Sequence, residues 1–411
     1  MRTIIALAAA AFLVSGAPPQ DPPREMPAKV VVHEWGTFTS VAGSDGASLE
    51  WRPLSGPSDL PSFVYTTAAS PKGFRHGKLC DACGHIKCGC GEKCAGECNC
   101  KGCIEATVRM ETPVLYFYSD RETTLEVKVG FPKGKITEWY PSARSLRGGI
   151  DWGGVRVMPG AEVSPRQQVT WNDYYYARQT DANPVRVCTA SEPEYEGFLF
   201  YRGVGTFDLP IAVSLEDGGK RVRFRNLGTD PIRPVIVFEN RDGKRAYGIY
   251  GLAGEKRDLT VGRPVDGDTI TYPDLDVEGA LKKHLVESGL FEKEASAMIK
   301  TWRASWFEPG LRVFYFIPRR MTDALLPLTI DPKPVEVVRT LVGRAEILTP
   351  EMEKSIAVQA ARLGADSIET RESAMAELRK YGRFAEPVLR KILATTTDPE
   401  VKVRIQNLIG G

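Results

Sequence analysis

Residues 29–39 read KVVVHEWGTFT, and this stretch decides the fold class. Three valines, two threonines, a tryptophan and a phenylalanine fill most of its positions. β-Branched and aromatic side chains favour an extended backbone, because they pack well on a pleated, half-buried surface. The stretch therefore predicts a strand at the start of a β-rich body.

Four segments downstream share this strand-like character. Residues 106–118 are rich in β-branched and aromatic side chains, and every second residue from 125 to 129 is leucine or valine between charged neighbours. A period of two is typical of a strand with one buried face. Residues 311–317 and 337–348 return to the same composition.

Turn signals separate further strands. Asp217-Gly218-Gly219 and Asp242-Gly243 each lie between two apolar, strand-like runs. Asp-Gly steps favour the tight turns that join neighbouring antiparallel strands. Without an intervening helical pattern, these signals predict antiparallel sheets, in one or two β-sandwiches across residues 28–270, within a body that extends over residues 29–349.

A helical pattern interrupts the body at residues 277–306. Leu281, His284 and Leu285 share one helical face, and a second apolar stripe follows Gly289. Because strand-like residues resume after this pair, it is predicted to be an excursion from the β body.

Residues 350–411 are predicted to form a helical tail. Asp366 with Glu369 has the spacing of a capping box, and Asp398-Pro399 has the pattern of a helix start. The segments RESAMAELRKYG and AEPVLRKIL resemble a HEAT-like repeat over residues 366–409. One such unit is too small to be stable alone, so the tail is expected to pack on the body or to dock to a protein partner.

The N-terminus indicates export. After Arg2, an apolar run of about 13 residues ends in small side chains, which is too short to span a bilayer and is typical of a signal peptide. We expect a signal over residues 1–17 and a Pro-rich leader over residues 18–28; an uncleaved anchor is the alternative. No later apolar run reaches about 18 residues, so no membrane span is expected in the mature protein, which would reside in the periplasm, the cell envelope or the extracellular space.

Charge and motifs exclude several classes of function. The 54 basic and 52 acidic residues give a net charge of +2, which falls to +1 when Arg2 leaves with the signal. Neither a net excess nor a local basic run favours nucleic acid or an anionic membrane as the main partner. G-x-S-x-G, H-E-x-x-H, Walker and G-x-G-x-x-G patterns are all missing from the sequence.

One short segment carries eight of the nine cysteines, with the spacing C-x2-C-x4-C-x-C-x3-C-x3-C-x-C-x2-C. Its glycines and near lack of apolar side chains prevent a core of its own, so metal or disulfides must order it. Paired thiolates suit Zn2+ or Cu(I), and the interleaved lysines would lower the thiol pKa values. The segment resembles a metallothionein. The predicted ligands are Cys80, Cys83, Cys88, Cys90, Cys94, Cys98, Cys100 and Cys103, with His76 and His85 as further candidates.

Disulfides are the competing chemistry. An exported protein meets an oxidising compartment, where eight cysteines could form four bridges in one of about 105 pairings. A mixed or redox-switching state is the third alternative. Cys188 stands far from the segment and is expected to be a small buried side chain or a distant partner of it.

Three motifs together resemble a family of uncharacterised exported bacterial proteins. They are HEWGTFT at residues 33–39, RMETPV at residues 109–114, and residues 302–307. The resemblance implies export and a β-rich body over most of residues 30–349. It implies no activity.

Candidate catalytic groups are weaker than the cysteine signal. Glu34, Glu111 and Asp173 could serve an enzyme that acts on polysaccharide or peptidoglycan, if two of them lay about 5–10 Å apart in one cleft. His33 and Glu34 are neighbours in a strand and so face opposite sides, which favours structural roles for both. Aromatic residues around Trp171 and Trp139 suit either a sugar-binding surface or core packing.

The sequence thus favours an exported, non-catalytic binding or interaction protein with a thiolate metal site. The alternatives are a carbohydrate- or peptidoglycan-active enzyme and a disulfide-stapled structural protein of the envelope.

Overall fold

The computed structural model describes residues 28–51, 59–67, 104–253, 257–267 and 276–410. Among the described residues, strands account for 39% and helices for 30%, so the protein is mainly β with a helical C-terminal region, as the sequence predicts. The expected signal peptide, most of the leader and the cysteine-rich segment lie outside the described residues.

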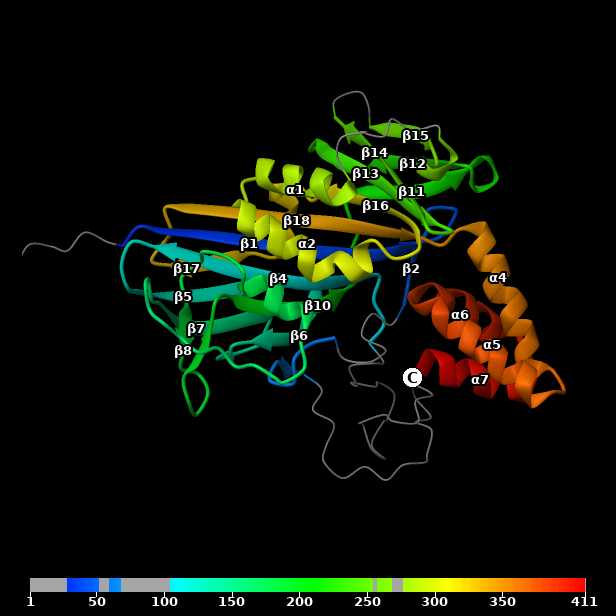
Figure 1. Cartoon of the computed structure of the whole chain (residues 1–411), viewed down its shortest axis with the longest axis horizontal. Helices are drawn as coiled ribbons and strands as arrows, with labels where there is room; N and C mark the ends of the chain where they lie inside the picture. The colour runs from blue at the N-terminus through cyan, green and yellow to red at the C-terminus, as the bar shows by residue number, and fades with distance from the viewer. Residues whose placement is uncertain (1–27, 52–58, 68–103, 254–256, 268–275, 411) are drawn as a thin grey trace, which may run out of the picture.

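A ten-stranded sheet forms the centre of the molecule (Figure 1). The predicted strand at residues 29–39 is its long β1 strand, near the middle. Nine strands lie in one row, and β2 (Ser48–Leu49) pairs with β1 beside it. The row is β14 (Lys244–Leu252), β13 (Ile232–Arg241), β16 (Gly310–Phe316), β18 (Glu336–Ile347), β1 (Val30–Ala42), β4 (Val108–Ser119), β10 (Leu199–Gly205), β6 (Gly134–Tyr140) and β3 (Tyr65–Thr66).

Two smaller sheets share a core with one face of the large sheet. The larger contains β17 (Leu328–Asp331), β5 (Thr123–Gly130), β7 (Gly149–Val157), β8 (Val185–Val187) and β9 (Glu194–Glu196). The smaller contains β11 (Ile211–Glu216), β12 (Arg221–Asn226) and β15 (Asp258–Gly262). Both Asp-Gly turns join antiparallel strands as predicted, β11 to β12 and β13 to β14.

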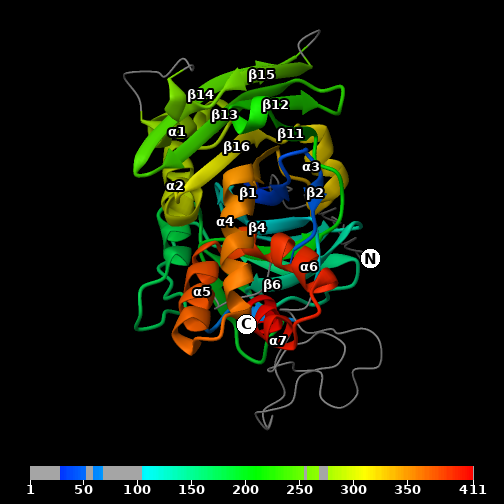
Figure 2. The ribbon, with the colours of Figure 1, turned by 90° about the vertical axis from the view of Figure 1, so that its right-hand side faces the viewer.

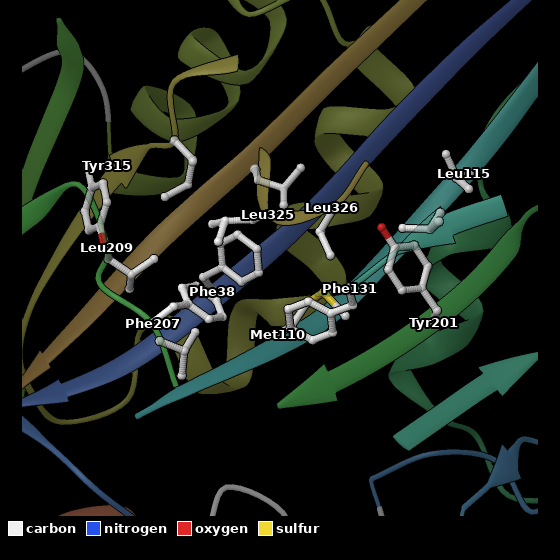
Figure 3. Close-up of a cluster of buried hydrophobic side chains, with 14 of the residues drawn as sticks. Phe38, Met110, Leu115, Phe131, Tyr201, Phe207, Leu209, Tyr315, Leu325 and Leu326 are labelled. Atoms are coloured by element: carbon white, nitrogen blue, oxygen red, sulfur yellow. The ribbon is translucent and has the colours of Figure 1, made fainter. Parts of the chain in front are cut away.

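The shared core is continuous along the central strands. Figure 3 shows Phe38 of β1 and Met110 of β4 among the aromatic rings of Phe131, Phe207 and Tyr201. The alternating residues of β5 enter the same core, because a strand directs every second side chain to one face.

The expectation of purely antiparallel sheets is wrong at one place. β1 and β18 run parallel over twelve paired positions, from Val31 opposite Glu336 to Ala42 opposite Ile347. Every other pair of described strands is antiparallel. Hairpin signals are local, whereas this pair joins segments from opposite ends of the body, and parallel neighbours always need a long connection.

Helices cover the opposite face of the large sheet. The predicted excursion forms α1 (Val277–Glu287) and α2 (Glu292–Trp306), whose apolar stripes pack on Trp35, Tyr116 and Phe314. A 3-10 helix, η3 (Asp173–Arg178), joins this layer, and α3 (Arg319–Leu325) lies between β16 and β17. Single 3-10 turns form η4 (Asp217–Gly219) and η5 (Pro264–Asp266).

The tail folds as four helices at one end of the strands (Figure 2). They are α4 (Pro350–Ala361), α5 (Ile368–Lys380), α6 (Ala385–Thr395) and α7 (Pro399–Gly410), with η6 (Arg362–Gly364) and η7 (Gly382–Phe384) between them. The α5 helix starts one residue later than the capping-box spacing predicts, because the Ser367 hydroxyl accepts the Thr370 amide. Asp398 caps α7 as predicted.

The tail packs on the body and does not stand apart from it. Val41 and Trp51 from the start of the body and Leu348 from the end of β18 belong to the same buried cluster as the tail's Ile356, Leu378 and Ile405. Of the two sequence alternatives for the tail, packing on the body is therefore observed. Among the described helices, none is both long and apolar enough to cross a bilayer.

Candidate functional site

Glu34 is locked in a buried ion pair. One carboxylate oxygen accepts the Tyr201 hydroxyl and the other accepts Arg339 Nε, while Arg339 Nη1 lies 2.8 Å from Asp323. Burial, followed by the charge of Glu34, raises the pKa of Tyr201 well above its usual value, so the phenol stays protonated and donates. Glu34 is fully buried, so no substrate can reach it.

His33 lies on the other side of β1, as the strand period predicts. Its Nδ1 is 2.8 Å from Glu294 of α2, and the same carboxylate accepts the Tyr118 hydroxyl and the Phe291 amide. Glu294 is fully buried. The motif histidine therefore holds the start of α2 against the large sheet.

Glu111 also lies on this helix-covered face. Its Oε2 accepts the Thr39 hydroxyl at 3.0 Å, and its Oε1 is 3.4 Å from Arg109 Nε, so Glu111 and Arg109 form an ion pair. Arg344 of β18 lies 3.9 Å away. Glu111 is 3% exposed, and the sheet separates it from Glu34.

Asp173 is exposed at the first turn of η3, beside the aromatic residues noted in the sequence. Tyr174 and Tyr175 are buried, whereas Trp171 is 54% exposed and packs edge-on against Tyr175 and Tyr176. Trp139 stacks with Tyr65. The three candidate carboxylates thus occupy three separate environments and do not converge on one cleft.

A cluster of buried charges that sequence reasoning missed connects the body to the tail. We call it the charged seam; it comprises Glu111, Glu308, Glu346, Arg312, Arg344 and Arg383. Arg312 Nε donates to Glu346 at 3.1 Å, and Arg344 bridges Glu346 and Glu308. Arg383 of the tail pairs with Glu308, so both parts of the chain contribute.

The guanidinium groups of the seam keep Glu346 ionised. Burial acts to raise the pKa of Glu346, but the charges of Arg312, Arg344 and Arg383 outweigh it and lower that pKa to about 2. Burial lowers the pKa of Arg344 to about 10, and repulsion from Arg383 and Arg312 acts in the same direction against the attraction of Glu346. The only sequence signal for the seam was the placement of Arg344 and Glu346 two residues apart on β18. Charges on alternate residues of a strand usually indicate an exposed face, so this signal pointed away from burial.

A cavity of about 580 Å3 lies next to the seam, where the body meets the tail. We call it the junction cavity. Its volume is within the range of small-molecule sites. Its walls are the β13–β14 turn, the segment that leads into β16, and helices α4 and α5. Apolar lining comes from Leu311, Met352, Tyr381 and Phe384.

Carboxylates outnumber cations around the junction cavity. The four lining cations already have partners. Arg263 and Arg241 both pair with the buried Glu239. Arg383 pairs with Glu308, and Lys380 pairs with Glu377. Two more lining carboxylates are Asp242, which forms no ion pair with any described residue, and Glu351, which is 3.8 Å from Arg263. Partial burial opposes ionisation of Glu351, but hydrogen bonds at the start of α4 and the nearby arginines lower its pKa, so it is charged. The cavity suits a ligand with one cationic group and an apolar part.

The described residues hold no group of three or more metal-ligating side chains. Cys80 to Cys103 and both candidate histidines, His76 and His85, lie outside the described part of the chain. Cys188 is exposed, so the expectation that it is buried is wrong, and it forms no disulfide among the described residues. Cys188 directly follows the short strand β8, and mostly polar residues come after it. This polar context was a sequence signal for its exposure.

No family model matches the chain, and no curated protein does. Among solved structures, the chain is similar to the Mu homology domain of Fcho1 from Danio rerio, which was solved with a bound Eps15 peptide. The identity is 7%, the match covers 78% of this chain and 97% of that one, and the TM-score is 0.28. A likeness this weak supports no conclusion, so the site is interpreted from its own geometry.

Proposed function

We propose that this is an exported, non-catalytic binding protein whose cysteine-rich segment binds Zn2+ or Cu(I) through its thiolates. The observation that carries the proposal is the placement of eight cysteines within 24 residues in C-x2-C and C-x-C units, which suit soft metal ions. The described residues on both sides of the segment are fixed to the body. Thr67 donates its amide to Thr137, and Ala106 pairs with Trp51.

The carboxylate geometry supports a binding role over the enzyme alternative. Glu34 and Glu111 are buried in ion pairs on opposite faces of one sheet, and Asp173 is exposed at η3. A glycosidase needs two carboxylates facing one sugar, with at least one able to exchange a proton with it.

The shape of the body and tail fits the same proposal. We interpret the large sheet and the two smaller sheets that share its core as a β-sandwich of the exported family noted above, and the tail as a HEAT-like unit. Val358, Ile368 and Val403 are large apolar residues on the tail that are each about half exposed. They would give a protein partner its contact.

Thiol counting distinguishes the metal proposal from the disulfide alternative. Replacing the exposed Cys188 by serine leaves only the eight cysteines of the segment. After purification under reducing conditions, elemental analysis should find Zn or Cu, and the denatured, chelated protein should give about eight thiols per chain. Almost no thiols before reduction, with no metal, would instead support a disulfide-stapled envelope protein.

The junction cavity gives a second candidate binding function, for a small cation with an apolar part. Benzamidine is a suitable probe, because it joins an amidinium to a ring. We expect the full chain to bind it, and the double substitution Asp242→Asn with Glu351→Gln to weaken binding about tenfold. Asparagine tolerates the left-handed backbone of residue 242, where φ is 53°, so the turn should survive.

A matched control is Glu353→Gln, since Glu353 is on the same helix but pairs with Lys391 outside the cavity. Equal loss of benzamidine affinity in the control and in the double variant would reject the cavity as the site.

A further inference from the structure

A second, smaller cavity lies on the other side of Arg383. Its volume is about 200 Å3, and it lies between the edge of the body and the tail helices α5, α6 and α7. We call it the anion pocket. The body contributes Trp51 and Arg109 to its lining. The tail contributes the polar side chains of Arg379, Arg383 and Glu386. Apolar side chains of the tail helices form the rest of the lining.

Guanidinium groups dominate the charge of this pocket. Three arginines line it against one carboxylate, Glu386, which accepts two hydrogen bonds from Arg390, at 2.9 and 2.7 Å. Arg379 is exposed in the last turn of α5 and forms no ion pair with any described residue. Arg109 lies 3.7 Å from Asp59 and Arg383 pairs with Glu308, so Arg379 is the lining arginine whose charge is left unbalanced by the described residues.

Two donors in the pocket lack an acceptor. Trp51 is 4% exposed, and its Nε1 has no hydrogen-bond partner in the described part of the chain. Arg109 Nε is 3.4 Å from Glu111, within ion-pair range, but it likewise makes no hydrogen bond to a described residue. Leaving a buried donor unsatisfied is unfavourable, so both groups are available to an acceptor that enters the pocket.

We propose that this pocket binds phosphate or a small phosphate monoester. The tetrahedral anion would accept the Trp51 Nε1–H and the forked donors of Arg109 and Arg379, an arrangement that matches guanidinium geometry. The volume is below the roughly 300–1,000 Å3 of sites for drug-sized ligands, which restricts the ester to a small apolar group. Because donors come from both the body and the tail, the anion would hold the two together.

The test is calorimetric titration of the full chain with inorganic phosphate in a low-chloride buffer. We expect saturable binding that Arg379→Gln weakens about tenfold, because the variant loses a charge-assisted contact but no ion pair within the described structure. Trp51→Phe keeps the aromatic volume and removes the N–H, and should weaken binding several-fold. Arg362→Gln is the matched control, since Arg362 is an exposed tail arginine outside the pocket whose side chain bonds only to Gln359 in the described chain.

The outcomes are distinguishable. Wild-type affinity in R362Q with reduced affinity in R379Q and W51F supports the pocket. Equal affinity in R379Q and R362Q, or no binding of phosphate at millimolar concentration, would overturn it. Acetate that binds as tightly as phosphate would replace the phosphate assignment by a general carboxylate site. Failure of the metal proposal would leave these outcomes unchanged, because no variant here touches a cysteine.

Discussion

The parallel pair of β1 and β18 carries a buried ion cluster at each end, and the two clusters differ in kind. At one end, Glu34 lies opposite Arg339 and bonds to it and to Tyr201. At the other end, Glu346 lies among several guanidinium groups of the charged seam. The first cluster belongs to the body alone, whereas the second continues into the tail through Arg383.

This difference indicates a structural role for the Glu34–Arg339 pair and a functional role for the charged seam. A single matched pair can hold two strands in register, and the Glu34–Arg339 pair does so for the one parallel pairing that no local signal specifies. The seam instead joins two parts of the chain, and Arg383 lines both the junction cavity and the anion pocket. Buried charges that the body and the tail share, and that lie beside cavities, are therefore the better candidates for a binding site.

The largest expected effect tests whether the tail depends on the body. Residues 350–411 expressed alone should lack a cooperative thermal transition and should self-associate, because Val41, Trp51 and Leu348 no longer cover their apolar face. Circular dichroism with analytical ultracentrifugation measures both properties. A monomer that melts cooperatively would show that the seam joins two independent units.

The next effect compares the two clusters directly. Glu346→Gln should lower the free energy of unfolding by about 3–5 kcal/mol, because it leaves the buried Arg312 without its paired carboxylate and removes one of the partners of Arg344. Glu34→Gln should lower the free energy of unfolding by less, because only Arg339 loses a partner and Arg339 still pairs with Asp323. Urea denaturation of both variants measures this difference.

Glu126→Gln is the control for the comparison, because it breaks a half-exposed pair with Arg144 and should cost less than about 1 kcal/mol. An equal or greater loss in the Glu34 variant than in the Glu346 variant would mean that the number of guanidinium partners does not decide the cost.

The sequence predicted the parts of this comparison that depend on local pattern. Alternation along β1 placed His33 and Glu34 on opposite faces, and the Asp242-Gly243 step placed the β13–β14 turn. Local spacing also located the helices, although the start of α5 moved by one residue to Ser367. Each of these features needs only a few neighbouring residues.

The rest could not be predicted, because it depends on partners that are far apart in the chain. Arg339 is 305 residues from Glu34, and Arg383 is 75 residues from Glu308. A single sequence gives no sign that Arg344 and Glu346 face inward, since alternating charges on a strand also fit a solvated face. The candidate carboxylates were therefore recognised as residues, whereas their distant partners, Arg339 for Glu34 and Arg344 for Glu111, were not.

Acid should reduce the contribution of the seam to the stability of the fold. The pKa of Glu346 is lowered to about 2 in the folded protein from a usual value near 4.5. Its contribution of about 3 kcal/mol is therefore fully present above about pH 4.5 and is lost as the pH falls towards 2. Urea denaturation at several pH values between 6 and 3 should show stability falling with pH in the wild type, and less steeply in Glu346→Gln. Parallel pH profiles for the two proteins would contradict this assignment.

The smallest expected effect concerns the cysteine-rich segment. Replacing residues 80–103 by a short Gly-Ser linker should change the melting temperature of the body by only a few degrees. Neither ion cluster contains a cysteine, and the flanking residues Thr67, Trp51 and Ala106 make their hydrogen bonds to residues that belong to the body. The free energy of closing a loop changes only logarithmically with its length, so shortening the segment adds little. Differential scanning calorimetry measures the change.

A variant with all eight cysteines of the segment changed to serine is the control, because it keeps the length and removes only the sulfur chemistry. Both variants should lose metal and keep the body's melting temperature if the segment is a binding element attached to a complete fold. A large drop in both would show that metal or disulfides stabilise the body. A drop in the linker variant alone would assign the loss to non-cysteine contacts of the segment. Only the first result would show that the body keeps its stability without the sulfur chemistry of the segment.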